Sequence, residues 1–536
     1  MIALQSAPVD TVRMTITPRG GDLHVTAAFP RSSADSIVFR LPPWAGVSDL
    51  WRMVTVDDAQ TADGASLPVV TTSGAWIVHD TRAPFTLRWR VAAGRFLFAG
   101  SNRSDLFRPF LAPDWGLAWG HGWVLQPDDS ALARTPVKLR VEPGDYSRTA
   151  LSRPGRLPSL PALAASLLIA GDYREYSDST SGLKLRFFVH GTEWTFADST
   201  FRRTVNSIAR TFVAAAGFAP AREQWIVLVE GNARNNGGTV EGGAIALYPD
   251  PASPLTGDDP STLRLIAHEL FHLWNGHASR ETGRGEGYYK WFQEGITEYY
   301  AHLALLRTGL LTVPAFVQRV NDFVREYESS SARGASAADL ERNYWADGAH
   351  QRLPYVKGFL LGWWLDLSLD RNRRSIDDVV RGVLRRPTYD DAALSAALAA
   401  ASRVHDARWY RDFAIGGRAL PFGQICREEG LDCVEADTDL FDFGFETGNR
   451  TIAAGAVVSS VTAGSPAEDA GIVVGDTLTG RVNYNAGDPT RDATIEVRRD
   501  GSSHAITFRP VVTRPIVFID PTSRTLARLN YLRRLR

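Results

Sequence analysis

The sequence predicts a multidomain protein with an all-β N-terminal domain, an α+β middle domain and a smaller β-rich C-terminal domain. A chain of 536 residues is too long for one hydrophobic core, so about two to four domains are expected. Strand-like alternation dominates the first third, helical periodicity begins near residue 260, and short strand-like runs return after residue 438. We therefore divide the chain into residues 1–174, 175–438 and 439–536.

The composition excludes two classes of partner. A hydrophobic content of 44% and a charged content of 22% are ordinary for a soluble globular protein. The net charge of −1 argues against a nucleic-acid partner, because such binding usually needs a basic surface. No window approaches the roughly 18 consecutive apolar residues of a membrane-spanning helix, so no membrane span is expected. Residues 1–10 lack the charged and apolar regions of a signal peptide.

The chain has two cysteines, Cys426 and Cys433. Their spacing suits a small disulfide loop, which an exported protein would form. Two free thiols in a cytosolic enzyme are the alternative. We favour a periplasmic or secreted location over the cytoplasm, and the localisation stays open.

Alternating apolar and polar residues predict strands throughout residues 1–174. Clusters of Gly and Pro separate these runs, which is typical of a sandwich-like domain. No group of residues with an evident chemical role occurs in this part. The clearest runs are Val12–Thr17, Leu23–Ala27, Ser36–Leu41 and Phe85–Val91.

The middle domain begins with strands and continues with helices, which predicts an α+β unit. Strands are expected at Leu183–Val189, Gln224–Val229 and Gly243–Tyr248, with a helix over Phe196–Ala216 and a Gly- and Asn-rich loop over Asn232–Gly243. From residue 260 the apolar residues recur at helical spacing. The expected helices are Thr262–Gly276, Trp291–Leu306, Pro314–Tyr327, Leu353–Leu369, Ile376–Leu384, Asp391–Ala401 and Ala407–Ile415. Gly276 is suited to cap the C-terminus of the first of these helices, Thr262–Gly276.

The first of these helices carries the motif His268-Glu-Leu-Phe-His272. Its two histidines are one turn apart, so both imidazoles leave the same face and can meet on one metal ion. Glu269 is placed to reach a water on that ion. The flanking residues are apolar, as a buried helix requires. Alone the motif is only moderately specific, because helical His and Glu also occur as ordinary polar residues.

A zinc peptidase needs three protein ligands and one open position for water. The metzincin pattern is unlikely, because Asn275 occupies its glycine position and Ala278 its last histidine position. Glu294, in Trp291-Phe-Gln-Glu-Gly, is the better third ligand, because its helix can pack antiparallel to the first.

Two further residues are candidates for supporting roles. Glu298 lies one turn beyond Glu294 and could accept a hydrogen bond from a ligating histidine, which would fix its tautomer. A solvated helix carboxylate is the equal alternative. Tyr355 is expected at a helix start and could donate its hydroxyl to a developing oxyanion. Taken alone, Tyr355 would be a packing residue.

The C-terminal domain resembles a PDZ domain. The resemblance rests on the turn and short helix at Ser465–Ile472 and on the Gly-Asp step at Gly475–Leu478. PDZ domains bind extended peptides by adding them as a strand to a sheet edge, so a peptide C-terminus or an extended strand is the expected ligand. Compared with other PDZ domains, this domain is shortened between Leu478 and Thr494. A basic tail, Arg524–Arg536, follows.

Three segments together resemble the M61 family, the glycyl aminopeptidase-like metallopeptidases. These segments are 268–275, 291–300 and 354–358, in that order. The family comprises gluzincins related to the M1 aminopeptidases. The resemblance implies a thermolysin-like fold for the middle domain and one catalytic Zn²⁺. It also implies His268, His272 and Glu294 as the zinc ligands, Glu269 as the general base and Tyr355 as the oxyanion donor.

The resemblance is weakest where the substrate would bind. The family usually carries a glutamate there that binds the free α-amine of the substrate, and Glu241, with Gly242 and Gly243, is the candidate equivalent at looser spacing. The expected activity is that of an aminopeptidase for small N-terminal residues such as Gly or Ala. Two alternatives stay open. One is an endopeptidase or oligopeptidase whose PDZ-like domain selects substrates, and the other is a peptide-binding scaffold without catalysis.

Overall fold

The computed structural model describes most of the chain and divides it into two compact units. The first unit comprises Met1–Asn206 and Ala221–Leu255, and the second comprises Ser207–Pro220 and Thr256–Arg536. The described residues are 11–93, 106–231, 236–370, 373–402, 407–448, 452, 454–479 and 488–534.

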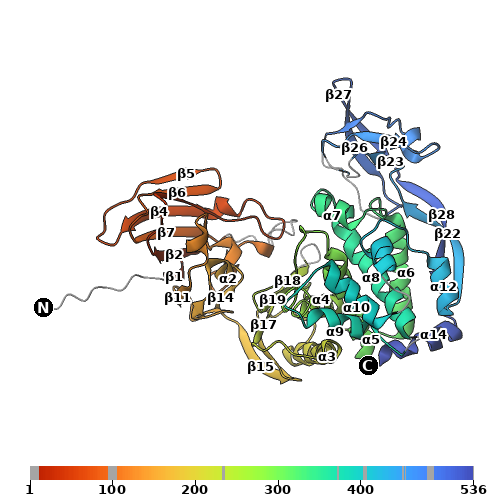
Figure 1. The fold of residues 1–536 in the computed structure, drawn as a ribbon, viewed down its shortest axis with the longest axis horizontal. Coiled ribbons are helices and arrows are strands. Elements are labelled where there is room, and N and C mark those ends of the chain that lie inside the picture. Colours follow the sequence, from red (N-terminus) through yellow and green to blue (C-terminus); the bar gives the residue numbers. More distant parts are fainter. Residues whose placement is uncertain are drawn as a thin grey trace. The chain divides into compact units, whose positions relative to one another are not determined.

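The N-terminal part of the first unit is built from strands (Figure 1). One sheet runs in the order β13 (Arg156–Leu157), β11 (Val137–Val141), β1 (Val12–Arg19), β2 (Asp22–Phe29), β7 (Phe85–Ala92) and β4 (Val54–Thr61). A second runs β10 (Gln126–Pro127), β3 (Ser36–Arg40), β6 (Ala75–His79) and β5 (Val69–Thr72). A third runs β12 (Thr149–Leu151), β14 (Leu167–Gly171), β9 (Trp115–Trp119) and β8 (Phe110–Leu111).

Aromatic side chains join the first two of these sheets. The rings of Phe29 and Phe85, on the first sheet, stack with centroids 5.2 Å apart, and the ring of Phe39, on the second, lies 5.2 Å from Phe29. Alternate residues of β1 and β2 are buried, as one face of a sheet packed on a core requires. The prediction of a β-rich N-terminal region is confirmed.

A five-stranded sheet completes the first unit. Its order is β15 (Arg174–Thr180), β16 (Leu183–Val189), β17 (Gln224–Leu228), β19 (Ala244–Tyr248) and β18 (Gly237–Glu241). The three inner strands are parallel, and every residue of β17 and β19 is buried, which accounts for their continuous apolar sequences. Helix α3 (Asp198–Ala216) connects β16 to β17 along the chain.

The prediction of a loop over Asn232–Gly243 was wrong for the second half of that segment. Gly237–Glu241 pairs antiparallel with β19, and Gly242 and Gly243 make the hairpin turn with φ values of 57° and 86°. Positive φ at both central residues is what a two-residue hairpin needs. The strand forms because β19 supplies its hydrogen-bond partners, which a Gly-rich sequence does not reveal by itself. Residues 232–235 lie outside the described part of the chain.

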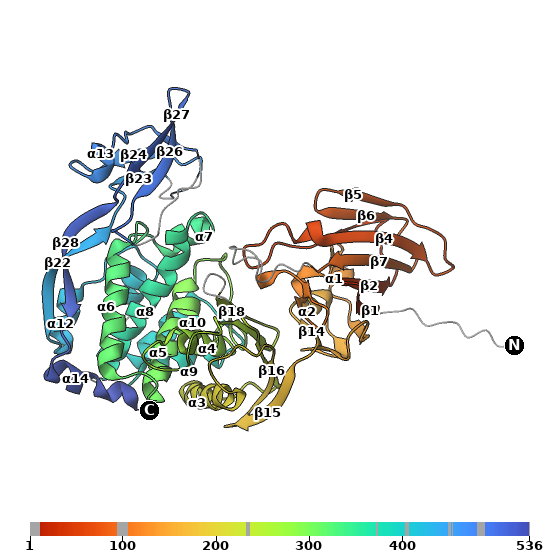
Figure 2. The same ribbon diagram turned by 180° about the vertical axis from the view of Figure 1, so that it is seen from behind.

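Helices dominate the second unit. Those that precede the C-terminal strands are α4 (Ser261–Phe271), α5 (Thr297–Arg307), α6 (Val313–Ser329), α7 (Ala337–Asn343), α8 (Gly348–Asp370), α9 (Ile376–Leu384), α10 (Asp391–Ala401), α11 (Ala407–Trp409) and α12 (Phe422–Glu429). Figures 1 and 2 both show α6 beside α8, and α5 packs against each of them. The hydroxyls of Tyr299 and Tyr300 on α5 donate to Asp366 (2.8 Å) and Asp377 (2.6 Å), which ties α5 to α8 and α9.

Helix α8 begins earlier than predicted, so Tyr355 lies inside the helix and not at its start. Asp347 accepts a hydrogen bond from the amide of His350 at 2.8 Å, as an N-cap residue does. This cap begins the helix upstream of Pro354, although a proline usually occupies a first turn. Helical residues of α8 therefore both precede and follow Tyr355 in the sequence.

The chain ends in strands and a returning helix. Strand β22 (Cys433–Phe441) pairs with β28 (Val511–Ile519), β23 (Phe445–Thr447) pairs with β24 (Val458–Val461), and β25 (Thr477–Leu478), β26 (Ala493–Arg499) and β27 (Ser502–Phe508) form a third sheet. A short helix, α13 (Pro466–Asp469), follows β24. The tail forms α14 (Ser523–Leu529) and η6 (Asn530–Arg533), and Arg528 donates to Asp370 of α8 at 2.8 Å. The final residues of the tail, 535–536, are outside the described range.

The sequence raised two further questions that concern the second unit and the helices, namely the pairing of the two cysteines and the presence of a membrane-spanning helix. Cys426 and Cys433 form a disulfide that connects α12 to β22. Within the described residues, no helix combines the length and the apolar character that crossing a membrane would require.

Candidate metal centre

His268, His272 and Glu294 converge on one point. Among the described residues they are the one group of His, Cys, Asp or Glu side chains close enough together to hold a metal ion. The two Nε2 atoms are 3.2 Å apart, and Glu294 Oε2 lies 3.4 Å from His268 Nε2 and 3.3 Å from His272 Nε2. The three ligand atoms thus form a nearly equilateral triangle.

The size of this triangle fits a tetrahedral zinc site. Zinc binds nitrogen and oxygen ligands at about 2.0–2.1 Å, so two tetrahedral ligands should lie about 3.3 Å apart. The observed separations span 3.2–3.4 Å. Two imidazole nitrogens and one carboxylate oxygen are also a ligand set that zinc prefers, and it leaves a fourth position open.

Hydrogen bonds at the far side of each imidazole fix its tautomer. His268 Nδ1 lies 2.8 Å from Glu298 Oε2, and His272 Nδ1 lies 2.9 Å from the carbonyl oxygen of Asn275. Both partners are acceptors, so each Nδ1 carries the proton and donates it. A neutral imidazole in this tautomer presents its Nε2 lone pair to the centre of the triangle, as metal-binding histidines require.

Charges around the triangle favour a bound cation. Burial would raise the pKa of Glu294, but the charges of His272 and Lys290 and hydrogen bonds from both histidines hold that pKa well below its usual value. Burial opposes protonation of His268, yet hydrogen bonds to Glu294 and Glu298 outweigh it and raise its pKa to about 9. A metal ion would take the place of the proton that this site otherwise holds.

Glu294 lies in a wide turn that the sequence pattern did not predict. Residues Trp291–Ile296 form a π-helical turn, η4, which continues into α5. Such turns are frequent at functional sites. Gly295 in this turn touches Gly358 of α8 so closely that a Cβ on either glycine would collide with the backbone of the other element. This close crossing brings α8, and with it Tyr355, beside Glu294.

Glu269 and Tyr355 both lie next to the triangle of candidate ligands. Glu269 follows His268 on α4 and is 7% exposed. The ring of Tyr355 stacks on the ring of His268, with centroids 5.8 Å apart and planes at 17°. Burial, and then the negative charge of Glu294, raises the pKa of Tyr355 well above its usual value. Tyr355 therefore keeps its hydroxyl proton at neutral pH and remains a hydrogen-bond donor.

Helix α4 is shorter than predicted: it ends at Phe271, and His272 is its C-cap residue. The chain then turns so that the carbonyl of Asn275 reaches His272. The Asn275 amide donates to the carbonyl oxygens of Phe292 and Gln293 at 2.8 and 3.2 Å, which holds this turn against η4. Gly276 adopts a φ of 117° beyond this turn, so it does not cap the helix as predicted.

The site contains three residues that the sequence did not single out. Arg264 donates to Glu298, Lys290 Nζ lies 3.4 Å from Glu294 Oε1, and the ring centroid of Tyr344 lies 5.7 Å from the same Nζ. Arg264 is four residues before His268, and Lys290 is four residues before Glu294. That spacing on a helix is the signal that could have found them. Nothing in the sequence around Tyr344 indicates its contact.

The predicted substrate residues belong to the other compact unit. Glu241 ends β18, and Gly242 and Gly243 follow it in the hairpin turn of the first unit. The carbonyl oxygen of Gly242 accepts a hydrogen bond from Arg153 Nε, and a Cβ on Gly242 would collide with the carbonyl oxygen of Ala165. These contacts fix the hairpin. The other predicted site residues, namely the three candidate ligands, Glu269, Glu298 and Tyr355, all lie in the second unit.

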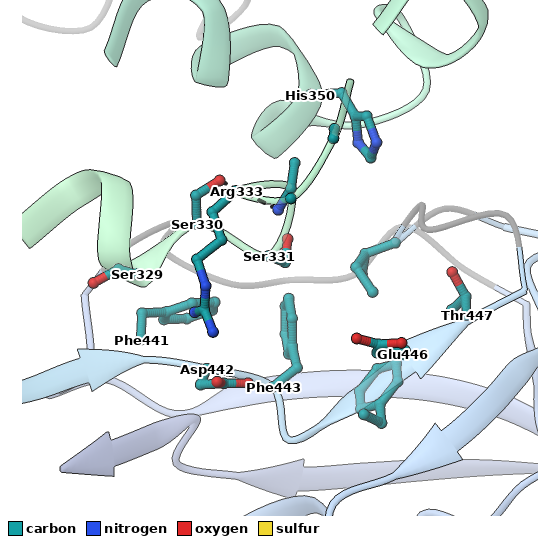
Figure 3. Close-up of a pocket in the computed structure, with 15 residues that line it drawn as sticks. Ser329, Ser330, Ser331, Arg333, His350, Phe441, Asp442, Phe443, Glu446 and Thr447 are labelled. Carbon is teal, nitrogen blue, oxygen red and sulfur yellow. Dashed lines mark hydrogen bonds between the residues drawn. The ribbon is translucent and has the colours of Figure 1, made fainter. Parts of the chain in front are cut away.

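A separate cavity of about 310 Å³ lies within the second unit between the loop that follows α6 and strands β22 and β23. Figure 3 shows Ser330, Arg333 and His350 on one side of it, with Phe443 and Glu446 on the other. His350 is fully buried, its Nδ1 lies 2.9 Å from Asp347, and its Nε2 has no hydrogen-bond partner among the described residues.

Comparisons with known proteins give one matching family and several solved structures with a similar fold. Residues 261–357 match the profile of the family described as M61 glycyl aminopeptidase, which confirms the resemblance seen in the sequence. An aminopeptidase N family protein from Idiomarina loihiensis has a similar fold, with a TM-score of 0.67 at 17% identity, covering 97% of this chain and 100% of that one. An M1 zinc metallopeptidase from Deinococcus radiodurans gives a TM-score of 0.49 at 14% identity, covering 77% and 94%. No curated protein sequence matches the chain.

Proposed function

We propose that this chain, whose residues 261–357 match the M61 glycyl aminopeptidase family, is a zinc-dependent aminopeptidase for small N-terminal residues such as Gly or Ala. The observation that carries the proposal is the triangle of His268, His272 and Glu294, whose edges of 3.2–3.4 Å suit zinc. These three residues would hold the ion. When bound, zinc polarises a peptide carbonyl and lowers the pKa of a water molecule.

The protein's own residues supply the proton transfers. Glu269 takes the proton of the attacking water as general base and delivers it to the leaving amine as general acid. Tyr355 donates its hydroxyl hydrogen to the oxyanion of the tetrahedral intermediate. Glu298 keeps His268 in the tautomer that points Nε2 at the centre. Bond cleavage thus needs one base, one oxyanion donor and one positioning carboxylate from this chain.

Replacing Tyr355 by phenylalanine should slow turnover by about 10²–10³-fold, because one oxyanion donor is lost. Zinc content should stay stoichiometric, since the hydroxyl is not a ligand. Steady-state kinetics and metal analysis measure the two quantities. Tyr327→Phe, a buried tyrosine on α6, is the matched control and should retain activity. Unchanged turnover in Tyr355→Phe would refute the assigned role.

We propose that Glu241 binds the free α-amine of the substrate, which makes the enzyme an exopeptidase. Glycyl or alanyl anilides with a free amine should be cleaved, and their N-acetylated forms should not. Glu241→Gln should raise KM for the free-amine substrates. Faster cleavage of the acetylated anilide would favour the endopeptidase or oligopeptidase alternative. Stoichiometric zinc without hydrolysis of any member of a broad peptide library would favour the scaffold.

For the remaining domains, the proposed division stays at residues 1–174, 175–438 and 439–536, with a thermolysin-like middle and a PDZ-like end. Strand β23 pairs with β24, and the cavity of Figure 3 runs beside β23. An extended peptide could add there as a strand. Failure of the full chain to bind any fluorescent peptide with a free C-terminus would contradict this ligand.

The disulfide supports a location outside the cytoplasm, periplasmic or secreted, because disulfides persist in oxidising compartments. Expression of the tagged full-length protein in its source organism, followed by fractionation, tests this location. Recovery in the cytosol with both cysteines reduced would contradict it.

A further inference from the structure

Arg264 is connected to the candidate metal centre through Glu298. It lies in the first turn of α4, four residues before His268 and therefore on the same face of the helix. Its Nη1 lies 2.9 Å from Glu298 Oε2 and 3.1 Å from Glu298 Oε1. The same Oε2 atom accepts the hydrogen bond from His268 Nδ1 at 2.8 Å. A continuous chain of charge-assisted hydrogen bonds thus runs from Arg264 through Glu298 to His268.

Glu298 depends on this arginine for its charge. The Glu298 side chain is 1% exposed, and Arg264 is the one lysine or arginine within 4 Å of it among the described residues. Two histidines are its other basic neighbours, His268 at 2.8 Å and His302 at 3.7 Å. Burial lowers the pKa of His302 to about 4, so it is neutral at neutral pH, and a His268 that binds zinc through Nε2 is neutral as well. A buried carboxylate whose charged partner is removed is left uncompensated, which is strongly unfavourable.

Arg264 is suited to this role by its surroundings. A cavity of about 240 Å³ opens behind it, so the guanidinium keeps contact with solvent while it donates inward. The two other arginines of this cavity have carboxylates of their own: Arg319 pairs with Asp322 at 3.1 Å, and Arg352 with Glu326 at 2.6 Å. Neither competes for Glu298.

We infer that Arg264 is a positioning residue that sets the zinc affinity of the site by holding the Glu298 carboxylate on His268. The inference rests on the proposed function, since it takes His268 to be a zinc ligand. It assigns Arg264 no contact with substrate or with the ion. Carboxylates that orient metal-binding histidines typically contribute 10–100-fold to metal affinity, and losing the arginine that holds the carboxylate in place should cost an effect of that size.

Arg264→Met keeps much of the side-chain bulk and removes the charge. It should raise the zinc dissociation constant by about 10–100-fold, measured by competition with a chromophoric chelator. Arg264→Lys should recover part of the affinity, because it restores the charge at one donor. Arg319→Met, in the same cavity but on a different carboxylate, is the matched control and should bind zinc as the unaltered protein does.

A double-mutant cycle separates positioning from general stability. If Arg264 acts through Glu298, then adding Arg264→Met to Glu298→Gln should change zinc affinity little, because no buried carboxylate remains to be held. The double variant also removes the unpaired charge, which keeps the test valid if Arg264→Met alone fails to fold. Equal losses in both backgrounds would overturn the inference, as would unaltered affinity in folded Arg264→Met. Absence of zinc binding in the unaltered protein would instead overturn the proposed function.

Discussion

Replacing Glu269 by glutamine is expected to reduce peptide hydrolysis by about 10²–10⁴-fold, because glutamine cannot accept the proton of the attacking water. Glu269 is buried beside His268, and none of the three ligand atoms of the triangle belongs to it. Zinc content should therefore be unaffected. Steady-state kinetics with an alanyl anilide and metal analysis of the same preparation provide both readouts.

A matched substitution distinguishes loss of the base from a general effect of losing a carboxylate. Glu428 lies on the exposed side of α12 and accepts a hydrogen bond from Gln424 at 2.7 Å, so Glu428→Gln is a suitable control and should retain activity. Activity of Glu269→Gln within a few-fold of the unaltered protein would remove Glu269 from the mechanism. Loss of zinc in that variant would show instead that Glu269 supports the metal site.

Replacing Glu294 by glutamine should abolish stoichiometric zinc binding at concentrations where the unaltered protein is fully loaded. The neutral amide is a poor ligand, and the effect should exceed the roughly 10–100-fold loss that follows from disturbing a supporting residue. Hydrolysis should fall with zinc occupancy. Isothermal titration of the metal-free protein with zinc measures the change.

Thermal unfolding gives an independent measure of the same effect. Zinc at 1,000 times its dissociation constant stabilises a folded protein by about 4 kcal/mol, so a chelator should lower the Tm of the unaltered protein. The same chelator should leave the Tm of Glu294→Gln unchanged. A zinc-dependent Tm in the variant equal to that of the unaltered protein would contradict the role of Glu294 as a ligand.

The grouping of the His and Glu side chains at the candidate site could be predicted because each lies in a local pattern. His268 and His272 are one helical turn apart, and Glu294 and Glu298 repeat that spacing on the next helical segment. Helical periodicity converts such spacings into shared faces without any knowledge of the tertiary fold. The structure accordingly brings His268, His272 and Glu294 together. Glu298 accepts a hydrogen bond from Nδ1 of His268, on the side of the ring away from this triangle.

The elements that carry these residues were less predictable, because their limits depend on distant partners. Helix α4 stops at Phe271 because the turn after it is held by η4, and β18 is a strand because β19 pairs with it. Both partners lie outside the local window that periodicity samples.

The sequence by itself determined which residue types could form a metal centre and in what order they occur. Only the tertiary structure decided the distances among them, the shape of the turn around Glu294 and the presence of Arg264 behind Glu298. Gly295 and Gly358, 63 positions apart by number, must touch before Tyr355 can stack on His268. Such contacts follow from the packing of whole helices, whose geometry depends on every side chain between them.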